Sequence, residues 1–154
     1  MLEAFKRIFK TGESVNPKRD VEKKLEIETC VILLEAAIAD SKLSKEELQK
    51  IIDLLKTKFR MTDSSANELI EASKKERESS PGLWHFTNLI NENLSLDEKY
   101  DLMEMIWNVI YSDGTLDDFE DYVAHKLLNL LRLDHSKFIE IKLKVKNASN
   151  IKSG

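Results

Sequence analysis

The chain has 154 residues, of which 42% are hydrophobic and 34% charged, and its net charge at pH 7 is −4. This length suits one domain with its own core. With only four glycines and two prolines, the chain has too few turn formers for an all-β protein. It also has no basic excess with which to bind a nucleic-acid backbone, so we expect a helical domain that binds no nucleic acid.

The first 17 residues read as an arm that precedes the domain. Leu2, Phe5 and Phe9 fall on one face of a short helix that also carries basic residues, and a linker then leads to Pro17. One interpretation is an arm that packs on its own domain or frays. The alternative is a basic amphipathic anchor for a membrane surface or a partner groove.

The main domain is predicted to span residues 18–147 and to consist of consecutive helices. Apolar residues that recur at helical spacing predict helices over 20–39, 44–59, 63–79, 83–92, 95–110 and 117–132. Ser44 with Glu47, and Ser95 with Glu98, fit capping boxes that start two of these helices. The single cysteine, Cys30, lies in an apolar run, where a buried inert thiol is expected. It also excludes an internal disulfide and fits a reducing cytoplasm.

Three aromatic side chains and the last segment complete this expectation. Trp84, Trp107 and Phe119 occur within apolar patterns and are predicted to lie in the core. Residues 138–146 alternate apolar and charged side chains as a strand does. We predict a helix there, because an isolated strand would have no partner in a helical chain. Residues 148–154 are expected to form a disordered tail.

The two halves of the chain share one pattern. A shift of 73 residues places Asp40 on Asp113, Leu43 on Leu116 and Glu47 on Glu120. In both halves an apolar helix is followed by an aspartate, a short loop with a leucine, and a glutamate in the first turn of the next helix. Two such hairpins could pack about a pseudo-twofold axis, each covering the apolar face of the other.

These motifs resemble the TerB-like (tellurite-resistance protein B) family. The stretch from Ala39 to Glu47 is similar to its first signature, A-D-G-x-(L/I/F)-x-x-x-E, and the stretch from Ser112 to Glu120 is similar to its second. Three further stretches, 83–92, 103–114 and 135–139, resemble a bacterial subgroup without a known activity. Ser41 departs from the pattern, because the family usually has glycine there.

The resemblance implies an all-α bundle of seven to eight helices with acidic surface clusters, for which metal binding has been suggested. It further implies a role in bacterial stress and tellurite resistance through complexes at the membrane. The family also resembles the helical domain of a membrane-anchored J-domain co-chaperone. These properties point to a protein partner and to a cytoplasmic location, peripheral to the inner membrane in one version of the hypothesis.

The acidic loops are the candidate site. Helix capping alone accounts for the presence of Glu47 and Glu120, since carboxylates suit the first turn of a helix. It does not cover Asp40 and Asp113, which follow helix ends where a negative charge is disfavoured. Either neighbouring amides donate to these aspartates or a cation neutralises them.

Five carboxylates crowd the second loop and its helix start, and such oxygen ligands suit calcium or magnesium. They are Asp113, Asp117, Asp118, Glu120 and Asp121. The spacing is not that of an EF-hand, because Ala124 stands at the twelfth position of that pattern and Asp118 at the sixth. The candidate metal ligands are Asp40, Glu47, Asp113, Asp117 and Glu120, and the candidate partner-docking residues are Asp118 and Asp121. Capping alone, a weak hard-metal site and an acidic docking surface all remain open.

No catalytic set accompanies these loops. His85, His125 and His135 form no zinc spacing, and neither a phosphate loop nor a nucleophile elbow is present. We therefore expect a non-enzymatic binding module that uses its acidic loops for a protein partner or a weakly bound divalent cation. The alternatives are a metal-dependent hydrolase that uses the clustered carboxylates and a peripheral membrane adaptor that uses the N-terminal helix.

Overall fold

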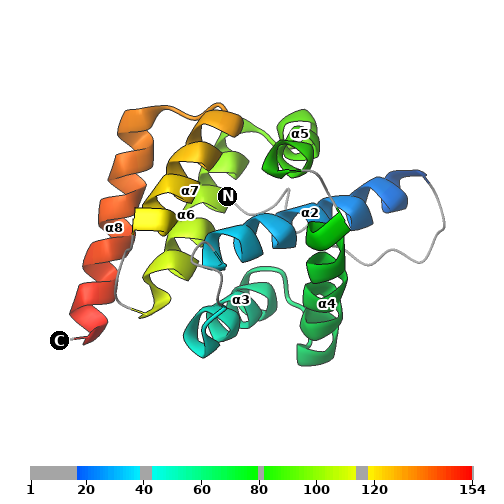
Figure 1. The fold of residues 1–154 in the computed structure, drawn as a ribbon, viewed down its shortest axis with the longest axis horizontal. Helices are drawn as coiled ribbons and strands as arrows, with labels where there is room; N and C mark the ends of the chain where they lie inside the picture. The colour runs from blue at the N-terminus through cyan, green and yellow to red at the C-terminus, as the bar shows by residue number, and fades with distance from the viewer. Residues whose placement is uncertain (1–16, 39–42, 80–81, 114–117, 154) are drawn as a thin grey trace.

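A computed structural model describes residues 17–38, 43–79, 82–113 and 118–153, and the side chains of most of them. These residues form seven α-helices and one short 3-10 helix, η1, with no strand among them (Figure 1). The bounds are α2 Pro17–Ala37, α3 Lys45–Lys58, α4 Asp63–Ser79, α5 Leu83–Asn93, α6 Leu96–Ile110, η1 Tyr111–Asp113, α7 Asp118–Leu130 and α8 His135–Ser153. The predicted all-α fold is confirmed. The N-terminal arm lies outside the described residues.

The C-terminal half of α2 lies among the other helices, whereas its first turns extend past α4 and α5 (Figure 1). The five consecutive residues from Cys30 to Leu34 are all 0% exposed. Successive residues of a helix point about 100° apart, so five buried residues in a row mean burial on every side. Helices α3, α4, α5, α6 and α7 all contact α2. The helix is therefore the centre of the core and not an amphipathic surface helix with one apolar stripe.

Helix α6 forms the second part of the core and carries α8. Trp107 on α6 is 0% exposed, as predicted, and its ring lies 5.2 Å from that of Phe138 on α8, centroid to centroid. Phe138 is itself fully buried. The helix predicted over 138–146 is confirmed, and α8 continues to Ser153, beyond the domain end placed at 147.

Side-chain caps fix where several helices begin. At α3 the Ser44 amide donates to Oε1 of Glu47 at 3.1 Å, and the Glu47 amide donates to Oγ of Ser44 at 3.1 Å. Ser95 forms the same predicted box at the start of α6. At α8 the amide of Lys137 donates to Oδ2 of Asp134 at 3.2 Å. Asp134, directly before the helix, thus serves as its cap.

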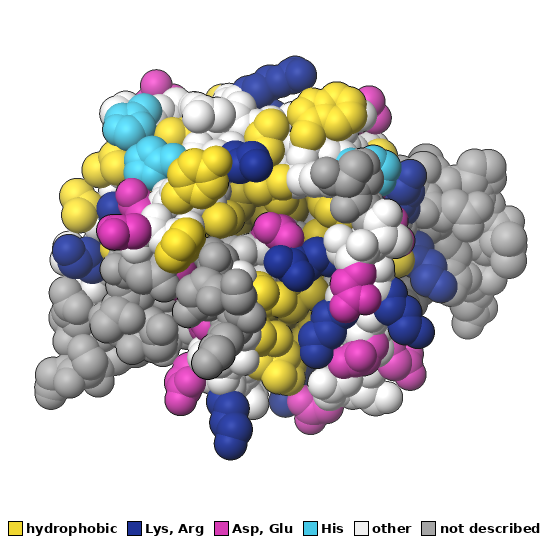
Figure 2. Space-filling model, viewed as in Figure 1, with side chains coloured by type: hydrophobic (Ala, Val, Ile, Leu, Met, Phe, Trp, Pro, Cys, Tyr) yellow, Lys and Arg dark blue, Asp and Glu magenta, His cyan; other side chains and the backbone are white. Residues whose placement is uncertain are grey.

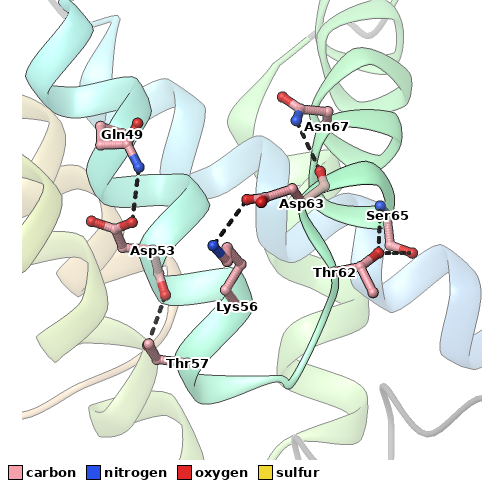
Figure 3. A network of polar contacts seen from close by, with 8 residues as sticks. All are labelled: Gln49, Asp53, Lys56, Thr57, Thr62, Asp63, Ser65 and Asn67. Atoms are coloured by element: carbon pink, nitrogen blue, oxygen red, sulfur yellow. Dashed lines mark hydrogen bonds and ion pairs between the residues drawn. The ribbon is translucent and has the colours of Figure 1, made fainter.

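The connection from α3 to α4 carries a small surface network (Figure 3). Nζ of Lys56 lies 3.0 Å from Oδ1 of Asp63, which joins the end of α3 to the start of α4. The Ser65 amide donates to Oγ1 of Thr62 at 3.1 Å and so caps α4. Arg60, between the helices, has a φ of 56°, a left-handed conformation typical of helix ends. These exposed contacts set the geometry of the turn more than they add stability.

Two aromatic residues predicted to lie in the core are exposed instead. Trp84 is 66% exposed and Phe119 is 64% exposed. Helix α7 buries Glu120, Ala124 and Leu127, whose spacing of four and three defines its inward face. Phe119 precedes that face by one residue and therefore points about 100° away from it. The prediction for these two residues was wrong because an apolar residue inside a helical pattern need not be in phase with it.

Replacing Phe138 by alanine should destabilise the protein by about 3–5 kcal/mol, because it removes a fully buried ring from the α6–α8 contact. Urea unfolding followed by circular dichroism measures this. Leu143→Ala on the same helix is the matched control, since Leu143 is 48% exposed and its loss should cost much less. Equal losses for the two variants would show that α8 does not depend on the Trp107 contact.

Candidate functional site

The structure describes part of the predicted acidic site. Glu47, Asp118, Glu120 and Asp121 have described side chains. Asp113 ends η1, but its side chain lies outside the description, as do Asp40 and Asp117 entirely. The proposed metal ligands Asp40, Asp113 and Asp117 therefore stay predictions.

Glu47 belongs to the framework of the fold. Its side chain is 4% exposed and faces the core from the first turn of α3. One carboxylate oxygen accepts the Ser44 amide at 3.1 Å, and acidic groups in this position are stabilised by the helix dipole. The geometry gives Glu47 the capping role that its sequence position suggested.

Glu120 lies at the corresponding place in the second half. It is the third residue of α7 and is also 4% exposed. Two glutamates 73 residues apart thus occupy buried first-turn positions on α3 and α7. This agreement supports the internal repeat, which otherwise stays a prediction.

Asp121 connects α7 to α8. Its Oδ1 lies 3.5 Å from Nζ of Lys142, and its Oδ2 lies 3.6 Å from Nδ1 of His125. Nδ1 of His125 also lies 2.9 Å from the backbone oxygen of Asp121, one turn earlier on α7. The carboxylate also affects Tyr111, whose pKa is raised first by burial and then by the charges of Asp121 and Glu120. Two carboxylates of the first turn of α7 therefore act on Tyr111 in the same direction.

Two exposed aromatic rings stand beside these acids. Phe119 is 64% exposed and Tyr122 is 65% exposed, and each follows an aspartate in the sequence. Asp118 is exposed and forms no ion pair with any residue that the structure describes. Together Asp118, Phe119, Asp121 and Tyr122 form what we call the acidic–aromatic face. The two aromatics were not predicted as functional, although their phase relative to Glu120 and Ala124 could have placed them outside.

The described side chains show no ready-made metal centre. No group of three or more His, Cys, Asp or Glu residues among them is arranged to hold an ion. Cys30 is 0% exposed, and burial raises the pKa of its thiol to about 11. A thiol held protonated in this way is a poor nucleophile, in agreement with the predicted inert role.

The family model for tellurite resistance protein TerB matches residues 26–143. The chain belongs to the TerB family. The TerB match starts within α2, ends within α8 and contains both acidic loops. The chain has no significant match among curated proteins or among solved structures. In the part that the structure describes, no helix of this TerB-family chain is long and apolar enough to cross a bilayer.

One buried carboxyl group lies away from the loops and was not predicted. Glu28 on α2 is 2% exposed, and its Oε2 has no hydrogen-bond partner. Burial raises its pKa to about 7, with opposition from the charge of Lys24 and further support from Glu76 and Glu92. A helical phase shared with Leu25 and Ile32 was the available signal, because it places Glu28 on a buried face.

Glu28 should make the stability of the protein depend on pH between about 4.5 and 7. Its pKa is higher in the folded state, so folding is favoured by protonation and loses this contribution as the pH rises through that range. Glu28→Gln should therefore match the wild type at pH 4 and exceed its stability at pH 8 by on the order of 1–3 kcal/mol. Urea unfolding at several pH values measures this, with Glu68→Gln on the exposed side of α4 as control. A constant difference between wild type and Glu28→Gln across the range would contradict the assignment.

Proposed function

We propose that this TerB-family protein is a non-enzymatic helical module that docks a protein partner through its acidic–aromatic face. The partner surface would combine basic and apolar side chains, and the setting would be bacterial stress or tellurite resistance, as the family suggests. The observation that carries the proposal is the exposure of Phe119 and Tyr122 beside Asp118 and Asp121.

Exposed aromatic rings favour a contact surface on physical grounds. A large apolar side chain left in water forgoes the free energy of burial, and aromatic residues are concentrated at the centres of protein interfaces. Phe119 and Tyr122 lie three residues apart and thus on neighbouring positions of one helix face. A partner that covers both rings recovers the burial that the isolated fold does not provide.

The surrounding charges indicate the character of the partner. Asp118 is free to pair with an incoming cation, and Asp121 is only partly neutralised because its carboxylate is 40% exposed. Negative charge at the rim of an apolar contact attracts basic partners and speeds their encounter. A lysine- or arginine-bearing surface with an apolar centre fits this arrangement better than an acidic one.

A hard divalent cation at the loop before α7 is the second candidate. It is favoured by the charges of Glu120 and Asp121, which add to burial in raising the pKa of Tyr111, and by the preference of calcium and magnesium for oxygen ligands. Glu47 and Glu120 are both 4% exposed, so an ion at either loop would depend on the aspartates. The docking proposal does not require this ion.

A photo-crosslinking residue at position 119 should capture one partner in cells, whereas the same residue at Lys75, exposed on α4, should not. With that partner purified, Asp118→Lys should weaken binding about tenfold, and wild-type affinity should fall as salt rises. Phe119→Ser should weaken it at least as much, because it removes apolar contact. Equal capture from both positions, or an affinity that neither variant changes, would contradict the docking surface.

Calorimetric titration tests the cation separately. If the loop before α7 holds calcium or magnesium, the wild type should release or absorb heat at millimolar metal, and Asp113→Asn should abolish that signal. Asp40→Asn should have a smaller effect, because no other aspartate stands near Asp40 in the sequence, whereas Asp117 and Asp118 follow Asp113 closely. Absence of heat for calcium, magnesium and zinc would leave docking as the only role for the loops.

A further inference from the structure

A cavity of about 280 Å³ opens between α2, α4, α5 and α7. Its charged wall consists of Glu35, Arg77 and Lys126, and the remaining lining comes from the start of α5 and from the middle of α7. Figure 2 shows this face of the molecule, with apolar side chains exposed in its centre and both basic and acidic groups around them. The volume is just below the usual range for ligand pockets, about 300–1,000 Å³, and suits a small molecule of about one ring.

The charged wall has one net positive charge. Nε of Arg77 donates to Oε1 of Glu35 at 2.5 Å, an ion pair whose two side chains are 30% and 27% exposed. This bond leaves the two Nη groups of the guanidinium for another acceptor. Lys126 has neither a hydrogen bond nor an ion pair with any residue in the described ranges. Two cations thus face one carboxylate, and one of the cations lacks a counter-charge.

The rest of the lining is apolar. Leu83 and Phe86, which are 8% and 2% exposed, line it from the start of α5, and Val123 and the 65% exposed Tyr122 line it from α7. Gly82 gives α5 no side-chain cap, so the positive end of the α5 dipole at the cavity edge is not neutralised by a capping side chain. The cavity therefore offers an apolar surface next to donors for an anion.

We propose that this cavity binds a small organic monocarboxylate that carries an aromatic or branched apolar group. A carboxylate can accept from the guanidinium of Arg77 and pair with the ammonium of Lys126, and its single charge balances the single net charge of the wall. The apolar group would cover Leu83, Phe86 and Val123. A cationic ligand would meet two like charges, and a doubly charged anion would exceed the net charge of the wall and be repelled by Glu35.

The proposal does not rest on the docking function. The cavity shares Tyr122 with the acidic–aromatic face, but Asp118, Phe119 and Asp121 are not among the residues that line it. Charge reversal at Lys126 tests the cavity, and charge reversal at Asp118 tests the face. Either proposal can therefore be contradicted while the other still holds.

The experiment is a titration followed by ¹⁵N–¹H correlation spectra of the full chain. The probes are phenylacetate, the amine phenethylamine and the neutral 2-phenylethanol, which share one ring and differ in charge. Phenylacetate should shift the amides around Leu83, Phe86 and Lys126, and Lys126→Glu should lower its affinity about tenfold or more, as expected for a lost and reversed charge contact. Lys146→Glu, an exposed lysine on α8 outside the cavity lining, is the matched control. A dispersed spectrum for each variant verifies its fold.

Equal shifts from phenethylamine and phenylacetate, or equal affinities of the Lys126 and Lys146 variants for phenylacetate, would overturn the proposal. Such a carboxylate can come from a free small acid or from the C-terminus of a peptide. A short peptide that ends in phenylalanine, with a free or an amidated C-terminus, then distinguishes these two sources. Tighter binding of the free-acid peptide than of phenylacetate would identify a chain end as the ligand. Weaker binding would identify a free small acid.

Discussion

The enclosure of α2 is the constraint on which the rest of this structure depends. A helix whose residues are apolar in every direction cannot remain at a surface, because each exposed side would lose the free energy of burial. Residues 30–34 impose this condition, and α3, α4, α5, α6 and α7 satisfy it by packing around them. Glu47 on α3 and Glu120 on α7 are buried in this packing at 4% exposure each.

Two buried first-turn glutamates link that core to the helix starts. Glu47 is buried against the core and closes the first turn of α3, and Glu120 is buried at the start of α7. At α3 the Ser44–Glu47 capping box fixes where the helix begins. On α7 the same orientation turns Glu120, Ala124 and Leu127 inward, which leaves Phe119 and Tyr122 in solvent. The exposure of these rings is thus a consequence of the rotation of α7 about its own axis in the packed fold.

Much of the fold could be predicted because its signals are local. Helical spacing placed α3, α4, α5 and α6 within a residue or two of their ends, and the capping boxes at Ser44 and Ser95 were correct in detail. The helix over 138–146 was predicted correctly because the sequence offers no other strand with which an isolated strand could pair. The TerB signatures named the family that the family model then matched.

What could not be predicted depends on contacts between helices. Whether Trp84 or Phe119 is buried depends on the rotation of α5 and α7 against α2, and a pattern of apolar residues does not define that rotation to better than one residue. The perturbed Glu28 needs the packing of α2 against α4 and α5 to be recognised. The cavity beside Arg77 and Lys126 joins residues from four helices, so no spacing along the chain could reveal it.

Native-state hydrogen exchange of α2 tests the central claim most directly. If α2 is enclosed on every side, the amides of residues 30–34 can exchange only when the whole domain unfolds. Their exchange free energies should then equal the free energy of unfolding obtained from urea denaturation, and they should be lowered equally by Phe138→Ala. Exchange of these amides through local openings, with free energies well below that of global unfolding, would contradict the account.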